Sequence, residues 1–394
     1  VTAATNGDAS RRNLILYRNG VEVERWENWT LTTTDSLYLI NLINTGRGAQ
    51  KKSKFVTAAV VTLNNMTDTE RLPASTTAGP FTGGDDGLAS IADADFYGGK
   101  TDAGATGLRC FDKIEEIHDI AGPGRVTSSF QNQLVAYCDS TREQQSFAVL
   151  GSAAGQTVAQ VRTYVTSTAS LKGLSEVARF VYPQVYVDNP APDVYGADAT
   201  ILAPNEGAVC GMQARVSGIG PGGAFEQAAG QELGFLRSVR GIETMEAEDF
   251  GKRGLLMDDN INVIRSQDGV PHYVDGSDCL DSEGLFATTG ESRGLVYVFN
   301  QVIKAVDPLR NRNINEGLYS RYKNALNDFF EALTDAGRFR TRVYKEAFFV
   351  DVGPGLNPDS AVEAQEVNAR FGLNTSPAAK FITFEAVKFR PAAA

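Results

Sequence analysis

Apolar strand segments alternate with helical segments in the centre of the chain, and this alternation constrains the fold more than any other feature. The runs "SFAVL" (146–150) and "ARFVYPQVYV" (178–187) predict buried strands. The runs "GLRCFDKIEEIHDI" (107–120) and "TVAQVRTYVTST" (157–168) have helical periodicity. Strands that alternate with helices are typical of an α/β layered domain, which we assign to residues 80–270.

The N-terminal part has the pattern of a β-rich domain, which we assign to residues 1–75. The run "NLILYRNGVEVERW" predicts a hairpin that turns at Asn19-Gly20, because both central residues of a type I′ turn need positive φ. A short helix is expected at 36–46 and a further strand at 54–63. The run "PASTTAGPFTGG" (73–84) has the composition of a linker to the next domain.

The C-terminal third predicts two long helices followed by strands, and we assign residues 271–394 to an α+β domain. The helices are expected in "SRGLVYVFNQVIKAV" and "EGLYSRYKNALNDFFEALTDAG". In the second helix, the apolar face consists of Leu318, Tyr322, Leu326, Phe329 and Leu333. Gly337 suits a left-handed cap that ends this helix. Strand candidates follow at 342–352, 367–373 and 380–390.

Charge and hydropathy argue against two classes of partner. The 394 residues carry a formal net charge of -11, and acidic and basic residues are interspersed, so direct nucleic-acid binding is not expected. Apolar runs such as "FVTAAVVTL" are too short and too interrupted to cross a bilayer, which needs about 20 apolar residues. We therefore expect no membrane insertion.

No catalytic or cofactor motif is found in the sequence. A Ser-His-Asp hydrolase would have to use His118 or His272, the two histidines of the chain, and neither lies in a matching context. There is no GxxxxGK[ST] phosphate loop and no GxGxxG dinucleotide motif, and "GIGPGG" (218–223) is interpreted as a loop. The adjacent pairs Glu115-Glu116 and Asp258-Asp259 would not face one another on a helix. We therefore expect no enzymatic activity and no cofactor.

The aspartates near residue 90 leave two interpretations open. Asp93, Asp95 and Gly98 form D-x-D-x-x-G, which is similar to the beginning of a calcium loop, but the downstream glutamate of an EF-hand is missing. The alternative is a tight turn followed by a short helical segment that Ser90 or Asp93 caps. We assign no metal ligands.

Several segments resemble, in the same order, those of contractile tail sheath proteins of bacteriophages and related injection machines. "GGDDGLASIADADFYGG" resembles the "GGxDG" segment that opens the central sheath domain. "LVAYCDSTREQQSFAVL" and "LAPNEGAVCGMQARVSGIGPGGAFEQAAGQ" resemble later segments of that domain, and "NARFGLNTSPAAKFITFEAVKF" resembles the last strands of the family. The chain departs from the family at "NEG" and "DGSDCL", and many members have an extended arm before the position of Val1.

The resemblance implies a structural subunit. Such proteins stack as hexameric rings in a helical lattice around a tail tube, between a baseplate and a tail terminator, and contraction drives the tube through the host envelope. The implied location is the phage virion, after assembly in the host cytoplasm. Neighbouring subunits exchange terminal arms that complete a shared β-sheet by strand addition. The implied arm residues are Lys380, Phe381, Ile382, Phe384, Val387 and Phe389.

Three alternatives remain open at this point. The segment 380–390 is either an arm or a central strand of the chain's own domain. Four cysteines without a CxxC pair are either buried free thiols or sites of bridges between subunits that must be reduced before contraction: Cys110, Cys138, Cys210 and Cys279. The chain is either a contractile sheath subunit or a non-contractile self-assembling tail or surface-layer protein, and a hydrolase is the remaining alternative.

Overall fold

The computed structural model divides the chain into two units, and each is described by itself. The described residues are 1–18, 20–60, 67–76, 79, 90–192, 196–220 and 222–379. Unit 1 comprises Val1–Ser90 with Asn189–Ala199, and unit 2 comprises Ile91–Asp188 with Thr200–Ala394. The first unit thus extends further than the predicted domain 1–75 and includes a second segment.

Unit 1 contains a three-stranded antiparallel sheet in the order β1-β2-β3. Its strands are β1 (Thr2–Ala3), β2 (Arg12–Arg18) and β3 (Val21–Trp29). The predicted hairpin is confirmed, because Arg18 pairs with Val21 and Gly20 has a φ of 80°. Asn19, the other predicted turn residue, lies outside the described residues.

The core of unit 1 contains both tryptophans of the chain. Trp26 and Trp29 are buried together with two residues of helix α1 (Leu39–Thr45), which lies inside the predicted helix. The strand predicted at 54–63 is wrong for residues 54–60, which follow an irregular path, and 61–63 lie outside the described residues. Backbone N–H groups of this stretch donate hydrogen bonds to the side chains of Glu24, Ser53 and Asn44 in place of a neighbouring strand.

Unit 2 is built on a five-stranded mixed sheet in the order β13-β12-β8-β7-β6. Strands β6, β7, β8 and β12 are parallel, and β13 pairs antiparallel with β12. Every residue of β7 and β8 is buried, as expected for parallel strands covered on both faces. The strands are β6 (Asp119–Ala121), β7 (Phe147–Gly151), β8 (Ala178–Tyr182), β12 (Ile261–Gln267) and β13 (Val270–Asp275).

Helices pack around this sheet and complete the mixed α/β fold. They are α4 (Ser128–Ala136), α5 (Val158–Thr163), α7 (Glu206–Ile219), α9 (Phe250–Asp258) and α10 (Thr289–Val306). The helix predicted at 157–168 is confirmed: Thr157 and Gln160 form a capping box at its start, and a π-helical turn continues α5 to Thr168. The predicted boundary after residue 270 falls inside β13, so the sheet extends beyond it.

Two predicted segments of this region differ in the structure. The helix expected at 107–120 is a 3₁₀ helix over Gly107–Lys113, and β6 begins at Asp119 because the end of the segment pairs with β7. The strand expected at 178–187 is divided at Pro183, which has no N–H to donate to a ladder. Its second half belongs to another sheet, in the order β10-β9-β11, with β9 (Val185–Asp188), β10 (Thr200–Ala203) and β11 (Val239–Ile242).

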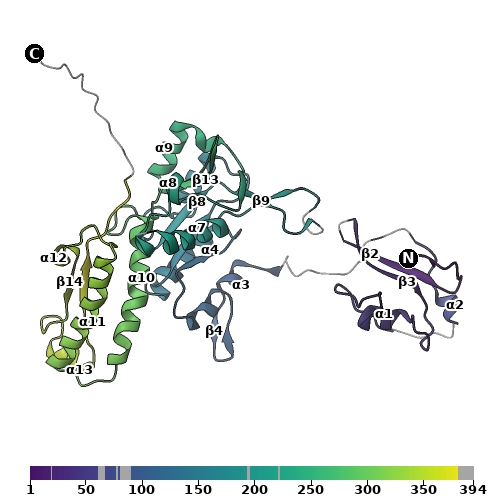
Figure 1. The fold of residues 1–394 in the computed structure, drawn as a ribbon, viewed down its shortest axis with the longest axis horizontal. Coiled ribbons are helices and arrows are strands. Elements are labelled where there is room, and N and C mark those ends of the chain that lie inside the picture. Colours follow the sequence, from purple (N-terminus) through teal and green to yellow (C-terminus); the bar gives the residue numbers. More distant parts are fainter. Residues whose placement is uncertain are drawn as a thin grey trace, which may run out of the picture. The chain divides into compact units, whose positions relative to one another are not determined.

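The C-terminal part of unit 2 has a second hydrophobic core. Helix α11 (Glu316–Asp335) confirms the predicted amphipathic helix; Asn315 Oδ1 accepts a hydrogen bond from the Leu318 N–H (2.9 Å) at its start, and Gly337 (φ 71°) follows its end. Helices α10 and α11 lie side by side, and α11 packs on the two-stranded sheet β14–β15 (Figure 1). These strands are β14 (Phe348–Asp351) and β15 (Arg370–Leu373).

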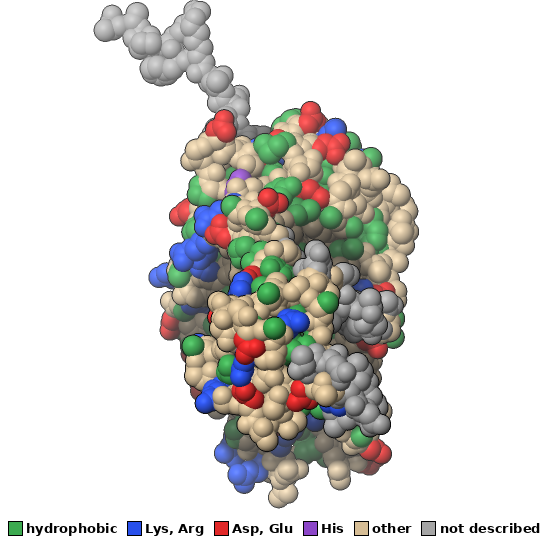
Figure 2. Space-filling model, turned by 90° about the vertical axis from the view of Figure 1, so that its right-hand side faces the viewer, with side chains coloured by type: hydrophobic (Ala, Val, Ile, Leu, Met, Phe, Trp, Pro, Cys, Tyr) green, Lys and Arg blue, Asp and Glu red, His purple; other side chains and the backbone are tan. Residues whose placement is uncertain are grey.

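The remaining elements are short. They are α2 (Asp68–Arg71), α3 (Asp93–Tyr97), β4 (Lys100–Thr101), β5 (Gly104–Ala105), a π-helical turn at Tyr137–Thr141, α8 (Gly230–Leu233), α12 (Tyr344–Ala347), α13 (Asp359–Glu363) and 3₁₀ turns at Gly223–Phe225, Glu246–Glu248 and Asp307–Leu309. Of the helices described, none combines the length and the apolar composition of a membrane span. Acidic, basic and hydrophobic side chains are mixed on the face drawn in Figure 2.

Candidate functional site

The sheet β14–β15 is the longer of the two two-stranded sheets in the described part of the chain. Phe348 pairs with Leu373 and Val350 pairs with Phe371, and these four side chains face the second core. In the described part of the chain the sheet ends with these two strands, so both edges present backbone N–H and C=O groups. A two-stranded sheet is marginal by itself, and here its stability comes from the core beneath it.

The aromatic core beneath this sheet explains its position. Phe330 of α11 is fully buried, and its ring centroid lies 5.1 Å from that of Phe371 and 5.4 Å from that of Phe348. On the opposite face, the Phe349 ring covers Gly372, where a Cβ atom would overlap the ring. The alternation of "FFVD" therefore places one aromatic residue in the core and one on the outer face.

Exposed hydrophobic side chains accompany β14. Phe349 is 53% exposed, Val343 is 53% exposed and Tyr344 is 41% exposed. Tyr344 also donates a hydrogen bond from its hydroxyl to Asp335 Oδ1 (2.7 Å). Large apolar groups next to open strand edges are the features of a surface that pairs with another chain.

The segment after β15 is fixed to both parts of unit 2 before the predicted arm begins. The Asn374 N–H donates to Ala347 O (2.8 Å), and Thr375 Oγ1 donates to Glu291 Oε1 (2.6 Å) at the start of α10. Ala378 and Ala379 line the same depression as Gly276, the residue that follows β13. The chain thus runs from the small sheet to the edge of the large one.

All of the predicted arm residues lie outside the described residues. They are Lys380, Phe381, Ile382, Phe384, Val387 and Phe389. The arm assignment therefore stays a prediction. The described part contributes the place where this segment starts, at the edge strand β13, and a separate two-stranded sheet with open edges.

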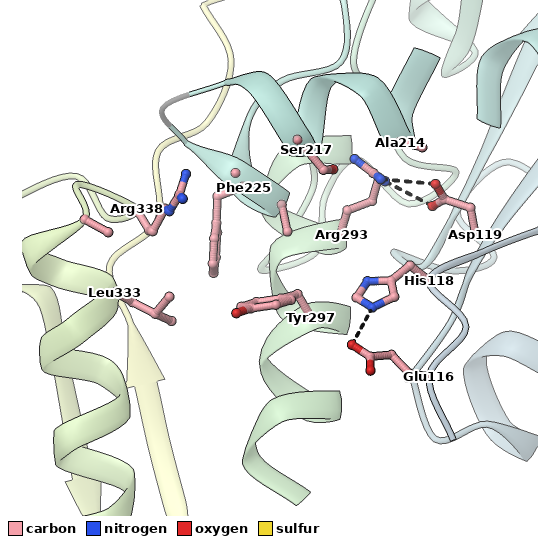
Figure 3. A pocket seen from close by; sticks show the side chains of 14 residues that line it. Glu116, His118, Asp119, Ala214, Ser217, Phe225, Arg293, Tyr297, Leu333 and Arg338 are labelled. Atoms are coloured by element: carbon pink, nitrogen blue, oxygen red, sulfur yellow. Dashed lines mark hydrogen bonds and ion pairs between the residues drawn. The ribbon is translucent and has the colours of Figure 1, made fainter. Parts of the chain in front are cut away.

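A groove of about 630 Å³ lies where α7, α10 and α11 approach β6 (Figure 3). Arg293 of α10 donates to both carboxylate oxygens of Asp119 in β6, at 3.0 and 3.1 Å. Both side chains are largely buried, and no described residue accepts a hydrogen bond from Arg293 Nη1. This ion pair joins the edge of the large sheet to α10, which contributes Val298 to the second hydrophobic core.

The histidines are far from forming a catalytic set. His118 Nε2 lies 3.4 Å from Glu116 Oε1 (Figure 3). Lys304 also forms an ion pair with Glu116. The Lys304 contact, followed by that of His118, holds the pKa of the Glu116 carboxyl below its ordinary value. His272 lies in β13, whereas His118 precedes β6, and these strands are the opposite edges of the sheet. The hydrolase alternative gains no support from this arrangement.

The other acidic candidates have structural partners. Asp93 Oδ2 accepts a hydrogen bond from Thr127, and Asp95 Oδ2 accepts one from the Ala92 N–H (2.8 Å). The N-cap residue of α3 is Ala92, so the prediction that Ser90 or Asp93 caps this helix is wrong. Asp259 pairs with Arg162 (2.6 Å). Within the described ranges, no group of three or more His, Cys, Asp or Glu residues is arranged to hold a metal ion.

The four cysteines differ in access. Cys138 and Cys279 are fully buried, and burial raises the pKa of both thiols far above the ordinary value. Cys210 is partly exposed, and burial raises its pKa to about 12. Cys110 is exposed, and its Sγ lies 3.1 Å from Ala105 O. A bridge to another subunit is thus sterically open to Cys110 and closed to the two buried thiols.

The two most deeply buried charged residues of the described part of the chain were not predicted. Arg179 lies in the middle of β8 with no exposed surface; its Nη2 donates to Gly276 O (3.1 Å), and burial lowers its pKa to about 10. Glu206, the first residue of α7, is 1% exposed and packs against Gly151 at the end of β7. Burial raises the pKa of Glu206 to about 7. The visible signal was an arginine inside the apolar run "ARFVY".

Comparison with solved structures identifies the fold. The chain is similar to one in the baseplate of the anti-feeding prophage, with 18% identity and a TM-score of 0.58 over 72% of this chain and 71% of that one. It is also similar to a chain of the PVC sheath complex of an extracellular contractile injection system in the contracted state. Here the identity is 17% and the TM-score is 0.57, over 71% of this chain and 73% of that one. For a chain of the contracted helical sheath of the anti-feeding prophage, the identity is 19% and the TM-score is 0.54, over 71% of this chain and 72% of that one.

No family model and no curated protein sequence matches the chain. The structural likeness at this identity establishes the fold, as the sequence resemblance predicted. The chain has the fold found in the sheath assemblies of contractile injection systems.

Proposed function

We propose that this chain is the sheath subunit of a contractile injection apparatus. The observation that supports this most is the shared fold with two sheath assemblies in the contracted state. The open sheet β14–β15 supplies the physical means of assembly, because an extended segment of another copy can add to it as a third strand.

Strand addition suits a lattice that must change shape without coming apart. Backbone hydrogen bonds keep neighbouring copies connected while each unit moves as a nearly rigid body. If contraction buries a further ~200 Å² of apolar area per subunit, about 25 cal/mol per Å² gives roughly 5 kcal/mol for each copy. Summed over the many copies of a sheath, this drives an inner tube forward without nucleotide hydrolysis.

The finer assignment follows from the sequence resemblance. We propose stacked hexameric rings around a tail tube, with a baseplate at one end and a tail terminator at the other. A phage tail that penetrates the host envelope and ejects a genome is the specific form implied; a cell-produced injection machine is the other form of the same architecture. The bridge hypothesis stays with Cys110, the exposed thiol.

Amide hydrogen exchange tests the assembly site. We expect the amides of β14 and β15 to exchange slowly in assembled particles and much faster in the dispersed chain, because a third strand would protect the open edges. Amides of β7, which has a strand on each side, are the internal control and should be protected in both states. Equal exchange of β14 and β15 in both states would rule out this sheet as the acceptor.

A further inference from the structure

A loop of unit 1 concentrates positive charge. Residues 46–55, here called the basic loop, contain Arg47, Lys51, Lys52 and Lys54 and no acidic residue. All four side chains are exposed, and none forms a salt bridge with a described residue. Residues 1–90 carry equal numbers of acidic and basic residues, whereas the whole chain has a net charge of -11. The basic loop is therefore a local positive site on an acidic protein.

The basic loop is held firmly against strand β3. Gln50 Nε2 donates to Glu27 O, and the Glu27 N–H donates to Gln50 Oε1, both at 3.1 Å. Trp26 Nε1 donates to Lys51 O at 3.1 Å. These bonds fix the backbone, so the charged side chains project from a defined position and less conformational entropy is lost when a ligand binds.

A carboxylate of β3 beside the loop is already used by the loop itself. Glu24 Oε2 accepts a hydrogen bond from Ser53 Oγ (2.5 Å), and Glu24 Oε1 accepts one from the Lys54 N–H (2.7 Å). Arg25 is engaged by Glu22 at 2.6 Å on the same strand. Of the acids of β3, Glu24 thus holds the loop and Glu22 pairs with Arg25. The lysine ammonium groups of the basic loop are left to bind an external anion.

The surface around these cations is shallowly hollowed. Two depressions of about 430 and 490 Å³ share the three lysines of the basic loop. Phe55, 47% exposed, lies at the rim of the first, and the Arg18 guanidinium carbon lies 5.7 Å from the centroid of its ring. A row of cations beside an exposed aromatic ring offers charge contacts together with an apolar surface for a sugar ring.

We propose that the basic loop binds an anionic polysaccharide, a glycan chain that carries phosphate or carboxylate groups. Several separate ammonium groups in shallow depressions match repeated single charges along a polymer better than one compact anion. The negative charge of the rest of the chain repels such a polymer and so confines binding to this loop. This site goes beyond the sheath function and does not depend on it.

The test is a binding titration with the purified full-length chain in its dispersed form. The probes are polygalacturonate, which carries carboxylates, and phosphomannan, which carries phosphates; they distinguish the two sources of charge. Neutral dextran and a single-stranded DNA oligonucleotide are the comparison ligands. We expect one or both anionic glycans to bind, with a slope of log affinity against log salt that is no steeper than about -3, from four contacts at about 0.7 each.

The decisive variant replaces Arg47, Lys51, Lys52 and Lys54 by glutamine. It should weaken glycan binding at least about tenfold with an unchanged denaturation midpoint, because exposed side chains without ion pairs contribute little to stability. The control removes the same charge from unit 2 with exposed residues, by glutamine at Lys100, Arg312, Lys323 and Lys345. Equal binding by both variants, or equal binding of DNA or dextran, would overturn the proposal.

Discussion

Deletion of residues 380–394 is expected to abolish sheath cylinders while the chain stays folded. The described hydrophobic cores consist of residues that precede Lys380, so the deletion should leave them intact. Losing about four intersubunit hydrogen bonds at about 1 kcal/mol each raises the concentration needed for assembly on the order of a thousandfold. Electron microscopy measures the cylinders, and circular dichroism measures the fold.

A matched control distinguishes the effect of the strand-forming side chains from the effect of chain length. Replacing residues 380–390 by a Gly/Ser segment of equal length should behave like the deletion, because backbone reach alone does not supply the apolar side chains of a strand. Two results would contradict the account. Unchanged cylinders would show that this segment does not connect the lattice, and unfolding of the shortened chain would show that it is a strand of the chain's own domain.

The substitution Asp119→Ala is expected to destabilise unit 2 by about 3–5 kcal/mol, because it leaves the Arg293 guanidinium buried without its counter-charge. That is a large part of the roughly 5–15 kcal/mol that stabilises a typical domain. The midpoint of chemical denaturation measures the change. Asp328→Ala, which removes an exposed carboxylate from α11, should change the stability by less than about 0.5 kcal/mol.

A double substitution tests the stated cause. Asp119→Leu with Arg293→Met removes both charges and keeps apolar volume, so it should recover most of the stability lost in Asp119→Ala. If the double variant is as unstable as the single one, the loss comes from packing and not from the uncompensated charge. If Asp119→Ala is neutral, the ion pair does not hold α10 to the sheet.

The sequence predicted correctly those elements whose form depends on residues close together in the chain. The hairpin at residues 18–21 and helix α11 follow from turn chemistry and apolar spacing within a few turns of chain, and both are present. Strand β6 was missed because its three residues end a segment with helical spacing, and pairing with β7 decides its form. Pro183 gave a visible signal for the divided strand that the prediction did not use.

The candidate site was only partly predictable. The strand candidates 342–352 and 367–373 contain β14 and β15, yet their pairing and open edges are tertiary facts. Arg293 and Asp119 are separated by 174 residues, and one sequence gives no means of pairing charges across that distance. The basic loop was missed because charge was judged over the whole chain, where four cations disappear in a net charge of -11.

Imaging of the purified native assembly by electron microscopy, before and after mild denaturant, tests the central claim most directly. The account predicts cylinders, hollow or filled by a tube, that become shorter and wider while neighbouring copies stay connected. Cylinders or layers that keep their dimensions until they dissolve would contradict contraction and favour a non-contractile tail or surface-layer protein. Monomers alone, under conditions that preserve the fold, would contradict the sheath proposal altogether.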